Sequence, residues 1–229
     1  MSHQSDRSRH NWVQCQNPAK PELKLQQQRQ KEPMFYYFAY GSCMCPVDLK
    51  RSLGENTHSY IIGPAILKNY RLGFYSYSPT RHCGVLDVLP DPNASVKGVL
   101  YQLPWRLSAY LDKREGVSES FYRREAVDIH CQNQVYTNAR TYIVVNKLTE
   151  ELAPNDWYFN VVLRGAVTCG LPEEYCWNLF DHMYKLQQRH QEQQMMRTPQ
   201  KPLLQLSPSL KITPQPRQRG GETEAKTKT

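Results

Sequence analysis

The chain has 229 residues, of which 39% are hydrophobic and 22% charged, enough for one or two domains. Its formal net charge of +8 comes from the two ends: residues 1–33 hold six Lys and Arg against three Asp and Glu, residues 188–229 hold eight against three, and the middle holds fifteen of each. A groove that binds nucleic acid would place a basic surplus inside the folded part, so this charge does not indicate a DNA- or RNA-binding protein.

Hydropathy and cysteine usage exclude further classes. No run of 18 apolar residues occurs, and the N-terminus lacks the basic, apolar and small-residue pattern of a signal peptide, so we expect neither a membrane span nor secretion. The seven cysteines are an odd number without a C-x-x-C spacing. Such usage is typical of free thiols in a reducing compartment and predicts a cytoplasmic protein.

Composition divides the chain into three parts. Residues 1–33 are polar, and residues 188–229 are basic and rich in Gln and Pro, so we expect a disordered tail at each end. All fifteen tyrosines and three of the four tryptophans lie between these tails. Residues 34–187 are therefore predicted to form a single domain.

The elements of this domain can be predicted in chain order. Met34–Tyr40 is an apolar run of strand length that ends at Gly41-Ser42, and Pro46–Leu53 has the proline near its start and the glycine after its end that a short helix favours. The remaining expectations are strands at Tyr70–Tyr77, Gly84–Leu89, Val96–Leu103, Tyr122–Cys131 and Ala139–Val145, and helices at Pro104–Arg114, from Asn155 onward and at Pro172–Leu186. The order predicts an α+β domain.

Common catalytic and metal-binding signatures are absent from the sequence. There is no G-x-S-x-G, no phosphate-binding loop, no G-x-G-x-x-G and no H-E-x-x-H. Cys43 and Cys45 together with His82 and Cys83 offer soft ligands, but their spacing differs from that of structural zinc sites. We therefore expect these cysteines to be packing residues and the protein to bind no metal.

Two local features could carry chemistry. A glycine between a strand and a helix, as at Gly41-Ser42, turns the chain tightly and exposes amide groups that can hold an anion, although many such turns only reverse the chain. Glu115 follows a predicted helix, where the helix dipole disfavours a carboxylate. This placement points to a function, whereas the alternative is a solvated glutamate beside Lys113 and Arg114.

The order of several motifs resembles the γ-glutamylcyclotransferase family over about residues 34–186. The motifs are Tyr37-Phe38-Ala39-Tyr40-Gly41-Ser42, Gly98-Val99-Leu100-Tyr101, Leu111-Asp112-Lys113-Arg114-Glu115-Gly116-Val117 with Tyr122 beyond it, and Tyr158 before Gly165-Ala166 and Gly170-Leu171-Pro172-Glu173-Glu174-Tyr175. The resemblance implies a mixed β-barrel-like core with flanking helices. It also implies a cyclisation, of lyase or acyltransferase type and connected with glutathione metabolism, that needs no metal or organic cofactor.

In that reaction a small γ-glutamyl amino acid closes on itself to give 5-oxoproline and a free amino acid. By position, the resemblance makes Glu115 the general acid/base. It makes Tyr37, Phe38, Ala39, Tyr40, Gly41 and Ser42 the turn that holds the substrate, and Tyr158 a further substrate contact. We expect such a protein to bind a small molecule and to bind neither nucleic acid nor a membrane.

One position departs from the family pattern, because members commonly have Asn where this chain has Cys43, and a thiol is a weaker hydrogen-bond donor than an amide. Two alternatives therefore stay open: a relative that acts on glutathione or γ-glutamylamines, and a catalytically inactive binding or scaffold protein of the same fold. The seven-residue step from Glu115 to Tyr122 favours γ-glutamyl amino acids over glutathione. The oligomeric state stays open too, a homodimer included.

Overall fold

The structure is a computed structural model, and it describes residues 32–197. The expected tail 1–33 lies outside these residues except for its last two positions, and the expected tail 188–229 lies outside them except for residues 188–197. Within residues 32–197, no helix combines the length and the apolar character needed to cross a membrane.

Five strands close into a barrel in the order β1-β3-β2-β4-β5. Their bounds are Met34–Ala39 (β1), Ile61–Ser78 (β2), Cys83–Pro104 (β3), Tyr122–Cys131 (β4) and Gln134–Val144 (β5). Neighbouring strands run antiparallel, except that β1 and β5 are parallel and meet at Tyr37 and Arg140. This closed barrel confirms the predicted α+β class with a mixed barrel core.

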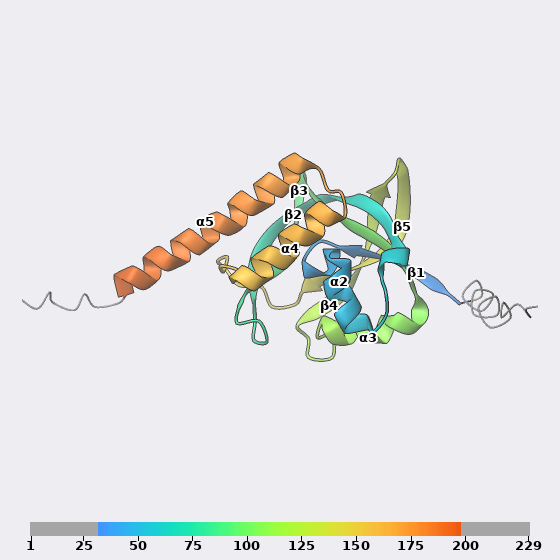
Figure 1. Cartoon of the computed structure of the whole chain (residues 1–229), viewed down its shortest axis with the longest axis horizontal. Coiled ribbons are helices and arrows are strands. Elements are labelled where there is room, and N and C mark those ends of the chain that lie inside the picture. The colour runs from blue at the N-terminus through green and yellow to red at the C-terminus, as the bar shows by residue number, and fades with distance from the viewer. Residues whose placement is uncertain (1–31, 198–229) are drawn as a thin grey trace, which may run out of the picture.

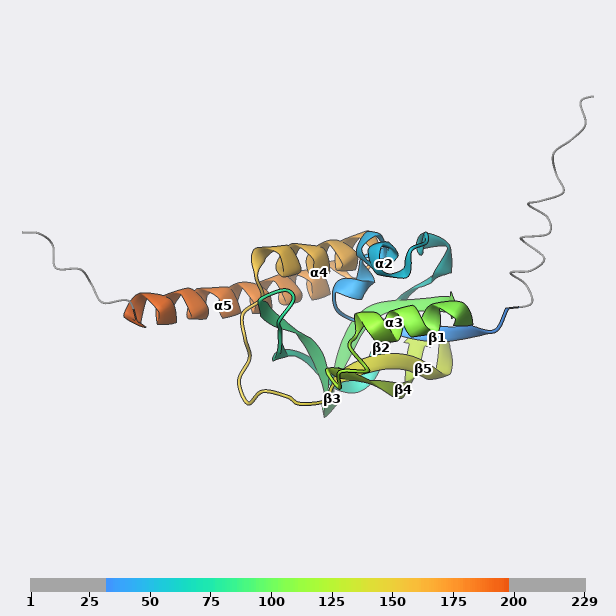
Figure 2. The same cartoon turned by 90° about the horizontal axis from the view of Figure 1, so that it is seen from below.

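Residues 32–197 contain four α-helices outside the barrel: Pro46–Leu53 (α2), Ser108–Arg114 (α3), Asp156–Thr168 (α4) and Glu173–Arg197 (α5). Helices α2 and α4 lie on one side of the barrel, and the second half of α5 extends away from it (Figures 1 and 2). Short 3-10 turns occur at Ser42–Met44, His58–Tyr60 and Trp105–Leu107. The predicted bounds of α2 and β4 are confirmed, whereas the helix expected at Pro104–Arg114 is a 3-10 turn followed by α3.

Strand β3 joins two strands that the sequence analysis separated at Pro90-Asp91-Pro92. The partner of β3 on β2 changes from Lys68 opposite Ser95 to Tyr70 opposite Pro90. Residues 91–94 therefore bulge out opposite Asn69, whose positive φ of 63° bends β2 at the same point. The turn signals in the sequence mark this bulge, which interrupts the pairing without ending the strand.

Helix α5 continues ten residues beyond Gln187, where the sequence analysis ended the domain. Residues 188–197 contain neither proline nor glycine and are rich in Gln, Arg, Glu and Met, which are good helix formers, and Pro199 follows. The last buried residues of α5 are Met183 and Leu186. The first half of α5 is thus held by packing against the rest of the protein, and residues 188–197 continue the helix into solvent.

Gly165 allows α4 to approach the turn that follows β1. A β-carbon at position 165 would lie 2.6 Å from the backbone nitrogen of Cys45 and about 3 Å from Met44. Such distances are below van der Waals contact, so only glycine permits this packing. The close approach fixes the Ser42–Met44 turn against the helix that carries Tyr158.

Candidate active site

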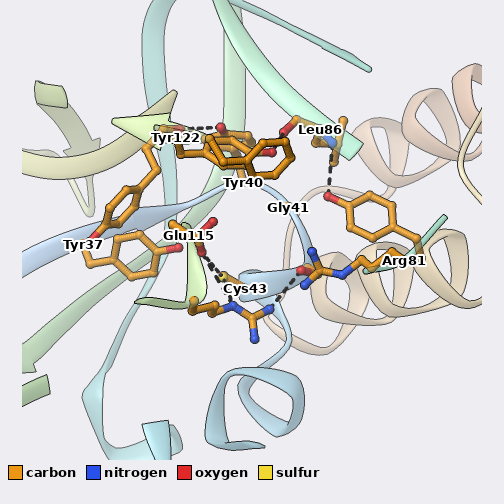
Figure 3. A pocket seen from close by; sticks show the side chains of 13 residues that line it. Tyr37, Tyr40, Gly41, Cys43, Arg81, Leu86, Glu115 and Tyr122 are labelled. Atoms are coloured by element: carbon orange, nitrogen blue, oxygen red, sulfur yellow. Dashed lines mark hydrogen bonds and ion pairs between the residues drawn. The ribbon is translucent and has the colours of Figure 1, made fainter. Parts of the chain in front are cut away.

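A cavity lies where the end of β1, the end of α3, the start of α4 and the β2–β3 hairpin meet (Figure 3). Most of its lining is aromatic or polar, and within the described residues Glu115 is the only carboxyl group in it. The lining residues are Tyr37, Tyr40, Gly41, Ser42, Cys43, Arg81, Leu86, Arg114, Glu115, Phe121, Tyr122, Tyr142 and Tyr158.

Glu115 directly follows Arg114, the last residue of α3, and caps the C-terminal end of the helix. Its amide donates to the Leu111 carbonyl at 3.0 Å, and the next residue, Gly116, turns into the left-handed region with a φ of 62°. The Glu115 side chain is 15% exposed and points into the cavity (Figure 3). The end of the helix therefore positions one carboxyl group toward the space between the tyrosines.

The neighbouring Arg114 is held by several acceptors outside its own helix. Its guanidinium contacts Asp48 of α2 at 2.6 Å and Ser42 of the turn at 3.0 Å, and it also donates to Ser52. Both Arg114 and Asp48 are less than a tenth exposed. This buried ion pair fastens the end of α3 to α2 and to the turn after β1.

Cys43 connects Arg114 with Glu115. Its thiol donates to Glu115 Oε1 at 3.1 Å and accepts from Arg114 Nε at 2.9 Å. Burial raises the pKa of the Cys43 thiol to about 12, although the positive charge of Arg114 opposes the shift. The group is thus a protonated hydrogen-bond donor at neutral pH and a poor nucleophile.

Tyrosine hydroxyls line the rest of the cavity. The Tyr122 hydroxyl donates to the Leu86 carbonyl at 2.7 Å, and the Leu86 amide donates to the Tyr158 hydroxyl at 3.1 Å. Both backbone polar groups of Leu86 are therefore hydrogen-bonded to tyrosines of the cavity. The Tyr40 hydroxyl donates to the Tyr142 carbonyl. Burial raises the pKa values of Tyr40, Tyr122 and Tyr158, which keeps these hydroxyls neutral.

The structure brings together most of the residues that the sequence analysis selected: Tyr37, Tyr40, Gly41, Ser42, Glu115 and Tyr158 all line the cavity. Phe38 and Ala39 do not. Phe38 is fully buried, and its ring lies 2.7 Å from where a β-carbon of Gly98 would be, while the Ala39 carbonyl lies 2.3 Å from that position. Both residues therefore pack against β3, and they are not available to a ligand in the cavity.

Sequence reasoning did not select Arg81, Leu86, Arg114, Phe121, Tyr122 or Tyr142 as site residues, although all six line the cavity. The sequence did offer a signal for Arg114 and Tyr122, because both belong to the motif region that contains Glu115. Arg81 follows the Ser78-Pro79 turn signal and lies at the tip of the β2–β3 hairpin. Nothing local to the sequence shows that this tip folds back over the start of α4.

Within residues 32–197, no group of three or more His, Cys, Asp or Glu side chains converges in a way that could hold a metal ion. The described cysteines are all unpaired thiols, namely Cys43, Cys45, Cys83, Cys131, Cys169 and Cys176.

Comparison with known proteins places this barrel among characterised folds. Residues 95–179 match the AIG2-like family. The Bacillus subtilis protein YkqA, whose γ-glutamylcyclotransferase name is provisional, is 33% identical over 145 residues, or 63% of this chain, and its crystal structure superposes with a TM-score of 0.62 over 71% of this chain. The chain spans 50% of the YkqA sequence and 59% of the YkqA structure.

A mouse γ-glutamylcyclotransferase is 27% identical over 150 residues, which is 64% of this chain and 77% of the mouse protein. A solved γ-glutamyl cyclotransferase structure, 27% identical, has a TM-score of 0.59 and aligns with 64% of this chain and 86% of its own. The motif order, the closed barrel and these relatives agree with one another: in sequence and in fold, the chain is similar to proteins named γ-glutamylcyclotransferase.

Proposed function

We propose that this protein is a γ-glutamylcyclotransferase that converts small γ-glutamyl amino acids to 5-oxoproline and a free amino acid, with Glu115 as general acid/base. The observation that carries the proposal is the position of the Glu115 carboxyl group, the only one lining the cavity within the described residues, facing the turn at Gly41-Ser42. The relatives named γ-glutamylcyclotransferase support the reaction class.

The first step needs a base and no enzyme nucleophile. Glu115 accepts a proton from the α-ammonium group of the substrate, and the freed amine attacks the γ-carbonyl carbon of the same molecule. A carbon–nitrogen bond forms and the carbonyl oxygen becomes negatively charged. Backbone amides of the turn at Gly41-Ser42 and the neutral tyrosine hydroxyls are the donors that would stabilise this oxyanion.

The second step releases the amino acid. Glu115 returns its proton to the nitrogen of the scissile amide, and the carbon–nitrogen bond to that group breaks. The oxyanion reforms the carbonyl group as this bond breaks, and the ring nitrogen gives up one of its two remaining protons to the released amine. The lactam nitrogen thus keeps one proton of the original ammonium group, and the amino acid departs as an ammonium ion. One carboxyl group can thus serve both steps, since the second protonation reverses the first deprotonation.

Cys43 supports an intact site in spite of the Asn that is common in the family. The thiol donates a hydrogen bond to Glu115 Oε1 and accepts one from Arg114, which in turn forms an ion pair with Asp48 of α2. Because the pKa of Cys43 is raised to about 12, the thiol stays protonated and can orient the carboxyl group throughout the reaction. The arrangement favours an enzyme over a scaffold protein.

The test is incubation of the purified full-length chain with a panel of γ-glutamyl amino acids, glutathione and γ-glutamylamines, with 5-oxoproline measured as product. Release of 5-oxoproline from γ-glutamyl amino acids in preference to the other two classes is the expected result. Turnover confined to glutathione or to γ-glutamylamines would change the substrate class. Absence of product with all three classes would leave a binding or scaffold protein.

A further inference from the structure

We infer that Arg81 is a carboxylate-binding residue of the cavity and selects substrates by a carboxylate that they carry. The inference deepens the proposed function and rests on it for the identity of the substrate. Arg81 lies at the tip of the β2–β3 hairpin and points into the cavity from the side opposite Glu115 (Figure 3).

The backbone of Arg81 is held in place from α4. Asn155, which caps the start of α4 by accepting from the Tyr158 amide, donates through its side-chain nitrogen to the Arg81 carbonyl at 2.7 Å. The His82 amide donates to the Ser78 carbonyl at 2.8 Å and closes the hairpin turn. The position of Arg81 relative to the cavity wall is therefore fixed by two hydrogen bonds of the peptide group that joins Arg81 to His82.

The side chain of Arg81 is placed by aromatic rings. Its guanidinium carbon lies 5.7 Å from the centre of the Trp157 ring and 5.6 Å from that of Tyr158. Trp157 is 45% exposed, whereas Tyr158 is buried, so the guanidinium group spans the boundary between solvent and cavity. These cation–π contacts hold the guanidinium group beside the rings, while its N–H donors stay available to a ligand.

Arg81 has no anionic partner in the described part of the chain: no carboxylate lies within ion-pair distance, and no acceptor is bonded to its guanidinium group. Arg114, the other arginine of the cavity, differs in this respect, because Asp48, Ser42, Ser52 and Cys43 occupy its donors. The cavity thus presents one free guanidinium group opposite one carboxyl group.

This arrangement matches the charges of a γ-glutamyl amino acid. Glu115 faces the position of the α-ammonium group in the proposed reaction, and the free donors of Arg81 suit a carboxylate, which a guanidinium group binds in a bidentate manner. Two carboxylates are available: the α-carboxylate of the glutamyl part, and the carboxylate of the amino acid that is released. A γ-glutamylamine has only the first.

The experiment measures binding by calorimetry in the full-length Glu115→Gln protein, so that no ligand is consumed. The ligands are γ-glutamyl-alanine and γ-glutamylethylamine, which differ only in the carboxylate of the released part. Each is titrated into the Glu115→Gln protein and into the same protein with Arg81→Gln, Arg81→Lys or Arg164→Gln added. Arg164 is an exposed arginine of α4 that does not line the cavity, and it is the matched control.

We expect Arg81→Gln to weaken the binding of γ-glutamyl-alanine by roughly 10- to 100-fold, Arg81→Lys to weaken it less, and Arg164→Gln to leave it unchanged. A loss confined to γ-glutamyl-alanine assigns Arg81 to the carboxylate of the released amino acid. An equal loss with both ligands assigns it to the glutamyl α-carboxylate. If Arg81→Gln lowers the melting temperature by several degrees, Arg81→Lys, which keeps the charge and the stem over the rings, is the variant that decides.

Unchanged affinity in both Arg81 variants would overturn the inference, and so would failure of the Glu115→Gln protein to bind either ligand. Turnover by the wild-type chain is measured separately as release of 5-oxoproline. Arg81-dependent binding without turnover contradicts only the proposed function, whereas turnover with Arg81-independent binding contradicts only the role of Arg81.

Discussion

The Cys43 thiol and the Glu115 carboxyl group, 72 positions apart in the sequence, are joined by a hydrogen bond of 3.1 Å across the wall of the cavity. Because the same sulfur accepts from Arg114 Nε at 2.9 Å, Cys43 holds both the last residue of α3 and the residue after it in a fixed relation to the turn after β1. The orientation of the proposed acid/base, Glu115, thus depends on a side chain from a distant part of the sequence.

Replacement of Glu115 tests the acid/base role. Glu115→Gln keeps the shape of the side chain and its acceptor oxygen for Cys43, but it cannot take up a proton. Since general acid–base catalysis contributes about 10²–10⁴-fold, we expect kcat for 5-oxoproline release to fall by roughly that factor, with KM changing little.

The matched control is Glu119→Gln, four residues further on, because Glu119 does not line the cavity. This variant should keep kcat within about twofold of wild type. Near-wild-type turnover in Glu115→Gln would show that another group transfers the proton.

Replacement of Cys43 tests its role as a positioning residue. Cys43→Ser and Cys43→Asn retain a side chain that can donate to Glu115, so we expect kcat to stay within about tenfold of wild type. Cys43→Ala removes the contact with both Glu115 and Arg114 and should reduce kcat further, while Cys176→Ser, a change at a buried cysteine outside the cavity, should not.

The pH response of Cys43 provides a second measurement. Burial raises the pKa of its thiol to about 12, so the group stays protonated at pH 8 and iodoacetamide should not modify it in the folded protein, as mass spectrometry of the digested protein would show. A glutamyl thioester trapped on Cys43 would contradict the proposed mechanism.

Asp112 gives the structure a predictable dependence on pH. It anchors α3 to the barrel by accepting from Arg124 Nε at 2.8 Å and from the Tyr142 hydroxyl at 2.7 Å. Burial opposes ionisation, but the hydrogen bonds from Arg124 and Tyr142 outweigh it and hold the pKa of Asp112 below its usual range. A carboxyl group whose pKa is lowered on folding stabilises the folded state above its unfolded pKa, and this stability is lost as the pH falls through the folded value.

We therefore expect Asp112→Asn to lower the free energy of unfolding at pH 7 by about 1–3 kcal/mol and to flatten its dependence on pH below pH 4. Urea unfolding at pH 7, 5, 4 and 3 measures both effects. Asp181→Asn is the control, since the Asp181 side chain is 57% exposed and, among residues 32–197, forms an ion pair only with Lys185 on its own helix. Parallel curves for wild type and Asp112→Asn would disprove the linkage.

The limits of the functional domain can be tested by truncation. We expect a fragment of residues 34–187 to fold cooperatively and to retain turnover, because the last buried residues of α5 are Met183 and Leu186 and residues 189–197 are exposed. Urea unfolding and 5-oxoproline release are compared with a fragment of residues 32–197 and with the full chain. If the shorter fragment unfolds without a cooperative transition, the extension of α5 belongs to the domain; if it folds without turnover, a removed segment belongs to the site.

Local patterns in the sequence determined where most elements lie. Alternating or continuous apolar residues, together with Pro and Gly at element ends, predicted β1, α2 and β4 within a residue, because these signals reflect interactions between near neighbours. They divided β3 into two strands, started β2 at Tyr70 instead of Ile61 and ended α5 at Leu186 instead of Arg197, because the partner strand and the solvated face decide how far the backbone continues. The barrel-like core and the acid/base role of Glu115 were predicted from the resemblance to a family.

The tertiary structure alone decided which side chains share the cavity. Phe38 and Ala39 lie in the same motif as Tyr37 and Tyr40, yet packing against Gly98 turns them away from the cavity. Arg81, from a hairpin tip without a local signal, reaches the cavity because Asn155 holds its backbone and two rings of α4 hold its side chain. Such contacts join residues far apart in the chain, so they depend on strand order, register and helix packing, which patterns among sequence neighbours do not encode.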